Sequence, residues 1–484
     1  MLFNSLGFAI FLPIIFIVYW ATPARYRYIP LLIASYYFYM SWNVKYVLLI
    51  LLTTAVSWGC ALMVEKCDKK RGKVYIILAL AVSLGVLFFF KYFNFVSTSV
   101  CSLLNALAIP VSPYVLNLTL PVGISFYTFQ SLSYVIDVYR GKVGAQRNFL
   151  KYALFISFFP QLVAGPIERT ENLMPQLFEE RSFDEKKAVM GLRLMLVGFV
   201  KKLVLSDALG KYVDIVFDDV HSYFGLTFIV AALLFTFQIY CDFSGYSDIA
   251  VGCAKLLNID LMKNFDSPYF SCSIREFWSR WHISLSTWFR DYVYIPLGGS
   301  RVKRSRQIFN TMVTMLVSGL WHGANWTFVV WGGLHGVYQV VERTFRKDRE
   351  FTKKDGVKNR IYMAGTRLVT FALVAFAWIF FRANSLSDAV FVITHLHNGV
   401  IHFGNAFLKM MIDMTFNEFS LTKVVLGLVA LGVYDYFSLK RDLLADYGRL
   451  PAVVRWLGYT LVVSVIIVLK LHGGTTQSFI YFQF

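Results

Sequence analysis

Apolar runs recur along the entire chain, and they constrain its fold more than any other feature of the sequence. A helix needs ~20 apolar residues to cross a bilayer, and runs close to that length lie near 5–22, 44–64, 74–93 and 223–241, with further candidates up to 453–471. Several runs are short or are interrupted by glycine, proline or polar residues. We therefore expect an all-α polytopic membrane protein with about eleven transmembrane helices and several partial or re-entrant helices.

The composition supports the same interpretation. The 484 residues are 57% hydrophobic and only 16% charged, whereas a soluble domain carries about a quarter charged residues. The 46 Phe and 28 Tyr suit the two membrane interfaces. We expect one integral-membrane domain over 1–484, with a motif-rich region over about 120–345 and further helices over 362–484.

The net charge of +18 comes from basic residues in short connectors such as "EKCDKKRGK" (65–73) and "RTFRKDREFTKKDGVKNR" (343–360). Basic connectors between apolar runs are typical of cytoplasmic loops. We expect a lipid bilayer and no nucleic acid as partner, because no soluble basic module accompanies the charge. The six cysteines form no C-x-x-C pair, and the histidines show no spacing typical of metal ligands, so no metal site is predicted.

Residues 242–306 combine polar, charged and aromatic groups at a higher density than other parts of the chain. At ~100° per residue, a helix through "EFWSRWHISLSTWFRDY" places Trp278, His282, Ser286 and Phe289 on one face, and Trp281 flanks His282. Two interpretations stay open at this point. The segment is either an interfacial helix with tryptophans at headgroup depth or the lining of a buried polar cavity.

A second histidine, His322, lies in "SGLWHGANW" (318–326) between two apolar stretches. In a continuous helix, Ser318 would stack one turn before His322, and Gly319 and Gly323 would permit close approach of another helix or a ligand. The two neighbouring tryptophans are Trp321 and Trp326. Ionisable groups inside membranes mark functional sites more often than not, although a histidine that only packs against a carbonyl is the alternative.

Common catalytic signatures are absent, since the sequence contains no G-x-S-x-G elbow, no Walker A motif and no G-x-G-x-x-G. A neutral histidine in a dry setting can take a proton from an alcohol during acyl transfer. It can also relay protons in a transporter. The residues alone leave an enzyme and a transporter open.

Five motifs in order resemble the membrane-bound O-acyltransferase family, in its bacterial branch that O-acetylates alginate, peptidoglycan and other polysaccharides. They are "LPVGISFYTFQSLSYVIDVYRG" (120–141), "FPQLVAGPIER" (159–169), "DFSGYSDIAVG" (242–252), "FWSRWHISLSTWFRDYVYIPLGG" (277–299) and "GLWHGANWTFVVWGGLHG" (319–336).

The resemblance implies a funnel of helices with the reactive histidine near the membrane midplane. It assigns catalysis to His322 and makes His282 a second histidine of the same tunnel. We expect supporting roles in the tunnel for a further set of polar and aromatic residues: Trp281, Ser286, Asn310, Ser318, Trp321 and Trp326. The tryptophans among them would keep water from the thioester.

The resemblance further implies cytoplasmic acetyl-CoA as donor substrate, with no bound cofactor. "SRVKRSR" (300–306) is a candidate contact for its phosphates, through Arg301, Lys303, Arg304 and Arg306. The expected partners are an extracytoplasmic SGNH-type acceptor protein and a cell-envelope polysaccharide, and the expected location is the cytoplasmic membrane. D-alanyl transfer to teichoic acid and a histidine-relay transporter stay as alternatives.

Overall fold

The computed structural model describes residues 1–163, 165–345, 357–471 and 479–480. These described residues form helices and connectors and include no β-strand. The prediction of an all-α membrane protein is confirmed. Part of the predicted cytoplasmic connector 343–360, namely residues 346–356, and parts of the predicted C-terminal region, 472–478 and 481–484, lie outside the described residues.

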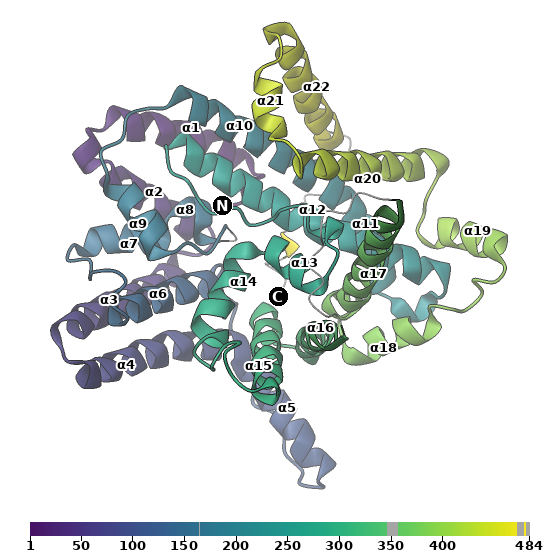
Figure 1. The fold of residues 1–484 in the computed structure, drawn as a ribbon, viewed down its shortest axis with the longest axis horizontal. Coiled ribbons are helices and arrows are strands. Elements are labelled where there is room, and N and C mark those ends of the chain that lie inside the picture. The colour runs from purple at the N-terminus through teal and green to yellow at the C-terminus, as the bar shows by residue number, and fades with distance from the viewer. Residues whose placement is uncertain (164, 346–356, 472–478, 481–484) are drawn as a thin grey trace. The chain divides into compact units, whose positions relative to one another are not determined.

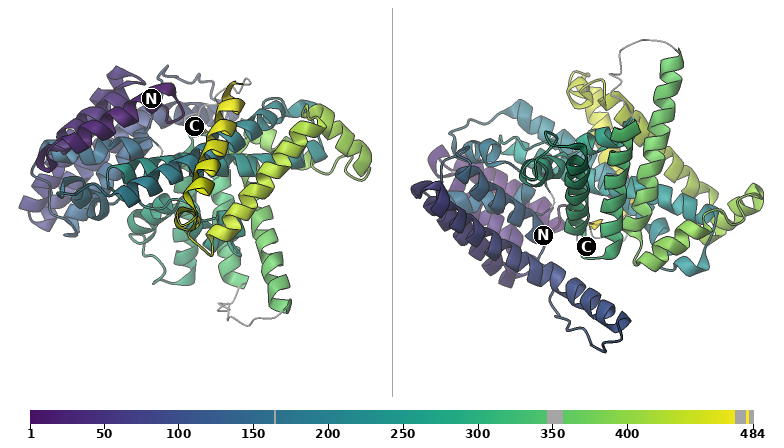
Figure 2. Two further views of the ribbon diagram at one scale, coloured as in Figure 1. Left: turned by 90° about the horizontal axis from the view of Figure 1, so that it is seen from above. Right: turned by 60° about the horizontal axis from the view of Figure 1, so that its bottom comes forward.

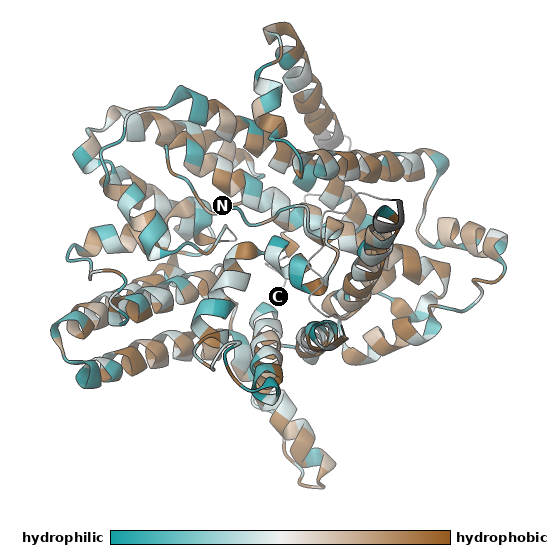
Figure 3. Ribbon diagram, viewed as in Figure 1, coloured by the Kyte–Doolittle hydropathy of each residue, from teal (hydrophilic) through white to brown (hydrophobic). Residues whose placement is uncertain are grey.

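Within the described residues, five helical segments are long and apolar enough to cross a membrane. They are Val44–Lys66, Lys69–Ala106, Leu226–Leu256, Arg360–Arg382 and Glu418–Ser438. Shorter apolar helices accompany them, so the number of about eleven crossings stays a prediction. The helices α20 (Glu418–Ser438) and α22 (Ala452–Leu471) are predominantly apolar (Figure 3), and side chains such as Trp456 and Leu461 are exposed. Exposed apolar faces of this kind suit contact with lipid.

The chain divides into two compact units. One comprises Met1–Met195 and Tyr246–Met262, and the other comprises Leu196–Gly245 and Lys263–Phe484. The helix α12 (Leu226–Leu256) contributes residues to both. The first unit contains α1 (Leu6–Ala21), α2 (Tyr28–Met40), α3 (Val47–Lys66), α4 (Lys69–Leu87), α5 (Phe93–Ala106), α6 (Ile124–Tyr139), α7 (Phe149–Ser157), α8 (Phe159–Leu162), α9 (Thr170–Phe178) and most of α10 (Glu185–Phe199).

The second unit contains every histidine and arginine predicted for the site. After a π-helical segment, η4 (Val200–Ser206), it continues with α11 (Asp207–Phe217), part of α12, α13 (Ile274–Arg280), α14 (Ile283–Phe289), the π-helical η7 (Arg290–Tyr294), α15 (Arg304–His322), α16 (Trp326–Phe345), α17 (Val357–Arg382), α18 (Leu386–His395), α19 (Phe403–Asp413), α20, α21 (Leu443–Gly448) and α22. Helices α13 to α17 lie together in this unit (Figure 1), and α16 and α17 run side by side (Figure 2).

Glycines bring α15 and α16 into close contact. A Cβ atom added at Gly319 would lie 2.3 Å from the Phe328 carbonyl oxygen, and one at Gly332 would lie 2.4 Å from that of Met315. Only a residue without a side chain lets the two backbones approach this closely. The prediction that Gly319 permits close approach of another helix is confirmed, and the partner is the helix that follows it in the chain.

Candidate active site

His322 ends α15, and the chain then turns sharply into α16. Gly323 is extended, with φ −159°, and a Cβ there would lie 2.1 Å from the Phe328 ring. The Asn325 side chain accepts a hydrogen bond from the Thr327 backbone N–H at 3.1 Å, which caps the start of α16. Gly323 and the Asn325 cap therefore stop α15 and start α16, so no continuous helix runs through this motif, and Ser318 and His322 still lie one turn apart within α15.

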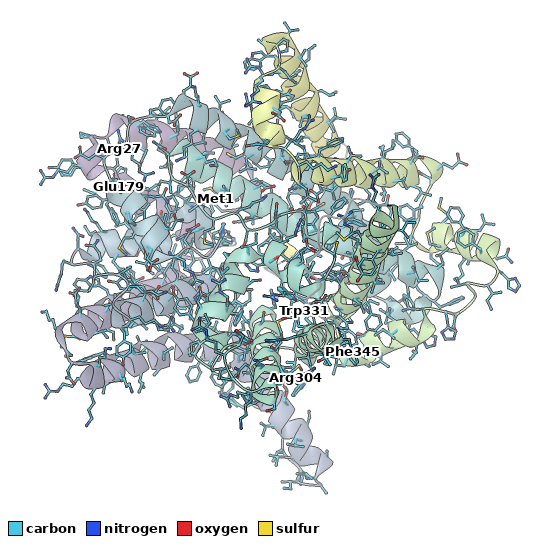
Figure 4. The ribbon with its side chains drawn as sticks, in the orientation of Figure 1. Met1, Arg27, Glu179, Arg304, Trp331 and Phe345 are labelled. Atoms are coloured by element: carbon cyan, nitrogen blue, oxygen red, sulfur yellow. The ribbon has the colours of Figure 1, made fainter. Side chains whose placement is uncertain are left out.

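Three aromatic rings surround the His322 imidazole, which is only 3% exposed. Its ring centroid lies 5.0 Å from Trp321, 5.0 Å from Trp331 and 5.5 Å from Phe381, in edge-to-face arrangements. Trp321 comes from the same helix, and Trp331 and Phe381 come from α16 and α17. Figure 4 labels Trp331 on α16. The setting is apolar and close-packed, as expected for a site that excludes water.

His282 lies at a break between α13 and α14, where its backbone is left-handed with φ +44°. Asn264 secures the break, since its carbonyl oxygen accepts the Ile283 N–H at 2.9 Å and its side-chain oxygen accepts the Ser284 hydroxyl at 2.9 Å. One continuous helix does not run through residues 276–292, and Trp278, Ser286 and Phe289 of this stretch line a cavity. The apolar spacing continues across the break, but hydrogen bonds from a distant loop replace those of a helix.

The break directs His282 into the same aromatic cluster as His322. The His282 imidazole is fully buried, and its centroid lies 4.6 Å from Phe243, 6.0 Å from Trp321 and 6.4 Å from His322. The structure thus brings the two histidines together, and that they line one tunnel stays a prediction. Trp321 packs against both rings and links them.

A cavity of about 1240 Å³ lies beside this cluster in the second unit. On α15 its lining residues recur at helical spacing of three or four, from Arg304 through Gln307, Ile308, Thr311, Thr314 and Met315 to Ser318. Such spacing defines one face of a helix. His322 is the next position on that face, one turn beyond Ser318, although neither His322 nor His282 lines the cavity itself.

The cavity is cationic at its exposed end. Arg275, Arg290, Arg304 and Arg343 line it there, together with the carboxylate of Glu342. Figure 4 shows Arg304 at the start of α15 and Phe345 at the end of α16, the ends that the short turn does not join. The Asp291 carboxylate accepts a hydrogen bond from Arg290 and raises the pKa of its guanidinium. A cationic mouth of this kind suits a phosphorylated ligand.

The structure brings some of the other predicted residues to the cavity and leaves others outside it. Ser286, Ser318 and Arg304 line it. Arg301, Lys303 and Arg306 are exposed and do not line it. Trp326, the first residue of α16, is 51% exposed and also lies outside the lining.

Asn310 and Trp281 have structural surroundings of their own. The Asn310 amide donates to the Gly299 carbonyl oxygen at 3.1 Å and so holds the turn before α15, three turns away from His322. Trp281 is fully buried among aromatic rings, with centroids 5.0 Å from Phe265 and 5.1 Å from Trp378. Their contribution to the reaction stays a prediction.

A buried ion-pair cluster was not predicted. Lys202, in η4, forms ion pairs with Asp242 of α12 and, at 2.9 Å, with Asp207. The Asp242 carboxylate also accepts the Ser206 hydroxyl at 3.1 Å and the Ile480 N–H at 2.8 Å. Asp242 precedes Phe243, which packs on His282, so the cluster positions one wall of the histidine site. A buried Asp in the "DFSGYSDIAVG" motif was the available signal, since an acidic residue in an apolar helix needs a cationic partner.

Sequence analysis also missed Arg275, Arg290 and Arg343 as cavity residues, because they belong to three separate segments.

For a metal, the described residues offer no cluster of three or more His, Cys, Asp or Glu side chains.

Comparison with known proteins gives a family match and several relatives. The model of the MBOAT, membrane-bound O-acyltransferase family matches residues 143–381, which include both histidines and the cavity. The chain is 37% identical to the probable alginate O-acetylase AlgI of Azotobacter vinelandii over 438 residues, 90% of this chain and 85% of that protein. It is 36% identical to a peptidoglycan O-acetyltransferase of Helicobacter pylori, covering 81% and 79% of the two chains. A teichoic acid D-alanyltransferase of Streptococcus thermophilus is 29% identical over 56% of this chain and 70% of its own.

Proposed function

The chain belongs to the membrane-bound O-acyltransferase family, as its motifs predicted, and we propose that it transfers acetyl groups from cytoplasmic acetyl-CoA for O-acetylation of an extracytoplasmic polysaccharide. That it is a multi-pass membrane acyltransferase follows from the family and the apolar helices. The donor, the acceptor and the cytoplasmic membrane as location are the proposed parts. The observation that carries the proposal is the lining face of α15, which leads from a cationic mouth to Ser318, one turn before His322.

The mouth supports a nucleotide-bearing thioester as donor. Arg343 lies at the start of the basic connector 343–360, which the positive-inside rule assigns to the cytoplasm. The mouth of the cavity then faces the compartment that contains acetyl-CoA. Arg275, Arg290, Arg304 and Arg343 bind the phosphates of the donor, and its flexible arm follows the polar face of α15. At 1.5 Å per residue, the 14 steps from Arg304 to Ser318 span about 21 Å along the helix axis.

Transfer of the acetyl group to a hydroxyl needs one general base. His322 accepts the proton of an acceptor hydroxyl as its oxygen bonds to the acetyl carbonyl carbon. The carbon–sulfur bond breaks, and the proton passes from His322 to the departing CoA sulfur, which leaves as a thiol. His282 orients the donor or donates a hydrogen bond to the carbonyl oxygen as negative charge develops there. The rings around His322 exclude water and suppress hydrolysis of the thioester.

The acceptor hydroxyl belongs to an SGNH-type partner outside the membrane, which passes the acetyl group to the polysaccharide. Relatives named for alginate and for peptidoglycan acetylation support a cell-envelope glycan as the final acceptor. The relatives named teichoic acid D-alanyltransferases make D-alanyl transfer the second candidate.

A donor assay with purified protein in liposomes separates the candidates. Radiolabelled acetyl-CoA and a D-alanyl thioester carrier protein are offered separately and in competition, and release of free thiol is measured. The proposal expects consumption of acetyl-CoA and none of the D-alanyl donor. Consumption of the D-alanyl donor alone would favour the second candidate. Flux of solute across the liposomes with no thiol released would indicate a transporter.

A further inference from the structure

A third histidine, His335 of α16, is fully buried and has no part in the mechanism above. It lies one turn before Gln339, which lines the cavity. Its imidazole stacks on Phe277 with centroids 6.1 Å apart, and it meets Trp278 and Trp331 edge-to-face at 5.1 Å each. The Trp278 indole N–H donates a hydrogen bond to His335 Nδ1 at 3.3 Å.

This hydrogen bond fixes the state of His335. An indole nitrogen only donates, so Nδ1 must carry no proton, and the neutral imidazole holds its proton on Nε2. In return, the bond orients the Trp278 ring. A buried tryptophan N–H needs such a partner, because leaving it unpaired in an apolar site is unfavourable.

Trp278 lies where the cavity ends. It is one of the buried lining residues, with Leu285, Met315 and Ser318, whereas the arginines lie at the exposed end. Behind it, Trp331 is 5.7 Å away, and Trp331 in turn contacts His322 at 5.0 Å. Two indoles thus form a wall next to the turn where a thioester would meet His322.

We propose that Trp278, held by His335, bounds the acyl end of the donor site and restricts the donor to an acetyl-sized group. The inference rests on the proposed function. A thioester beside Ser318 directs its acyl chain toward this wall, so each added methylene overlaps the indole. His335 does not touch the donor and acts as a positioning residue through Trp278.

The test measures kcat/KM for acetyl-CoA, propionyl-CoA and butyryl-CoA with the purified full-length protein. One methylene in a fitted pocket changes kcat/KM by about 10- to 200-fold. Trp278→Ala is expected to raise the butyryl-to-acetyl ratio by at least about ten-fold. Trp278→Phe, a milder change, shifts the ratio in the same direction by less and carries the test if the alanine variant does not fold.

His335 is tested with two variants. His335→Leu removes the acceptor and is expected to raise the same ratio, whereas His335→Asn places an amide oxygen near the position of Nδ1 and keeps the ratio close to that of the wild type. The matched control is Trp288→Phe, because Trp288 packs on Phe289 and Tyr292 and does not line the cavity.

An unchanged chain-length ratio in Trp278→Ala or Trp278→Phe overturns the inference, as does an equal loss with all three donors in His335→Leu. The wild type in the same assay distinguishes failure of the proposed function from failure of the proposed role of Trp278. If it consumes no acetyl-CoA, the proposed function fails. If it does and the ratios do not move, only the role of Trp278 fails.

Discussion

The imidazoles of His282 and His322 lie with ring centroids 6.4 Å apart, and Trp321 packs against both. They reach this position from two chain breaks, one between α13 and α14 and one between α15 and α16. The apolar spacing continues across the first break, whereas the second lies between two separate apolar stretches. The two breaks therefore bring the histidines together, and variants at the breaks test the roles of these residues.

Two replacements of His282 distinguish the role of its imidazole from the effect of its left-handed backbone conformation. Asparagine tolerates the left-handed conformation at φ +44°, whereas alanine is strained there by about 1 kcal/mol. We expect His282→Asn and His282→Ala both to lower kcat by about 100-fold or more, since alanine has no donor and the shorter asparagine amide does not reach the position of the imidazole Nε2. His282→Ala should also lower the Tm of the purified protein by more than His282→Asn does. Full activity in His282→Asn would remove this histidine from the mechanism.

The contact between α15 and α16 is tested at its glycines. Gly319→Ala places a methyl group 2.3 Å from the Phe328 carbonyl oxygen, so the helices must separate, at a cost of about 1–3 kcal/mol in the free energy of unfolding. We expect a lower Tm and a lower kcat, because His322 ends the displaced helix. Gly333→Ala is the control, since its new methyl group meets Leu316 at an ordinary 3.5 Å. Equal Tm values for the two variants would contradict the packing described.

The buried ion-pair cluster predicts a large effect far from any reacting atom. Asp242→Ala leaves Lys202 with one of its two carboxylate partners, and breaking a buried pair costs about 3–5 kcal/mol. We expect strong destabilisation on thermal unfolding and reduced turnover, because Phe243 no longer holds His282. Asp266→Ala breaks a surface pair with Lys263 and should cost at most about 1 kcal/mol. Similar losses of thermal stability in both variants would show that the buried ion-pair cluster contributes no more than a surface pair.

The cationic mouth predicts a KM effect. A hydrogen bond to a charged group contributes at least about 1.5 kcal/mol, and 1.4 kcal/mol corresponds to about ten-fold in affinity. Arg290→Ala and Arg343→Ala should therefore each raise the KM for acetyl-CoA by about ten-fold with little change in kcat. Arg301→Ala and Lys303→Ala, which remove exposed cations outside the cavity, should raise it less.

The control for this series is Arg449→Ala, which removes the same charge from an exposed ion pair with Asp446. Its KM should equal that of the wild type. The result that would contradict this expectation is a larger KM increase in Arg301→Ala and Lys303→Ala than in Arg290→Ala and Arg343→Ala. It would indicate that the "SRVKRSR" segment binds the donor phosphates.

The sequence was sufficient for the fold class and for choosing both histidines as candidates, because apolar runs and the motifs around His282 and His322 are local signals. It was not sufficient for the break at His282. Helical spacing continues across His282, and the bonds that stop the helix come from Asn264, in another segment. The cavity was equally hidden, since Arg275, Arg290 and Arg343 meet only through tertiary packing. Asp242 gave a local hint, but its partner Lys202 lies on a different helical segment.

In the proposed mechanism, His322 is the base for transfer of an acetyl group. The direct measurement is transfer from radiolabelled acetyl-CoA to the extracytoplasmic acceptor by wild-type protein and by His322→Gln, purified alike and matched for Tm. General base catalysis contributes about 100- to 10,000-fold. We expect His322→Gln to lose at least 100-fold of the wild-type rate while its KM for acetyl-CoA changes little. Transfer by His322→Gln at the wild-type rate would contradict this mechanism.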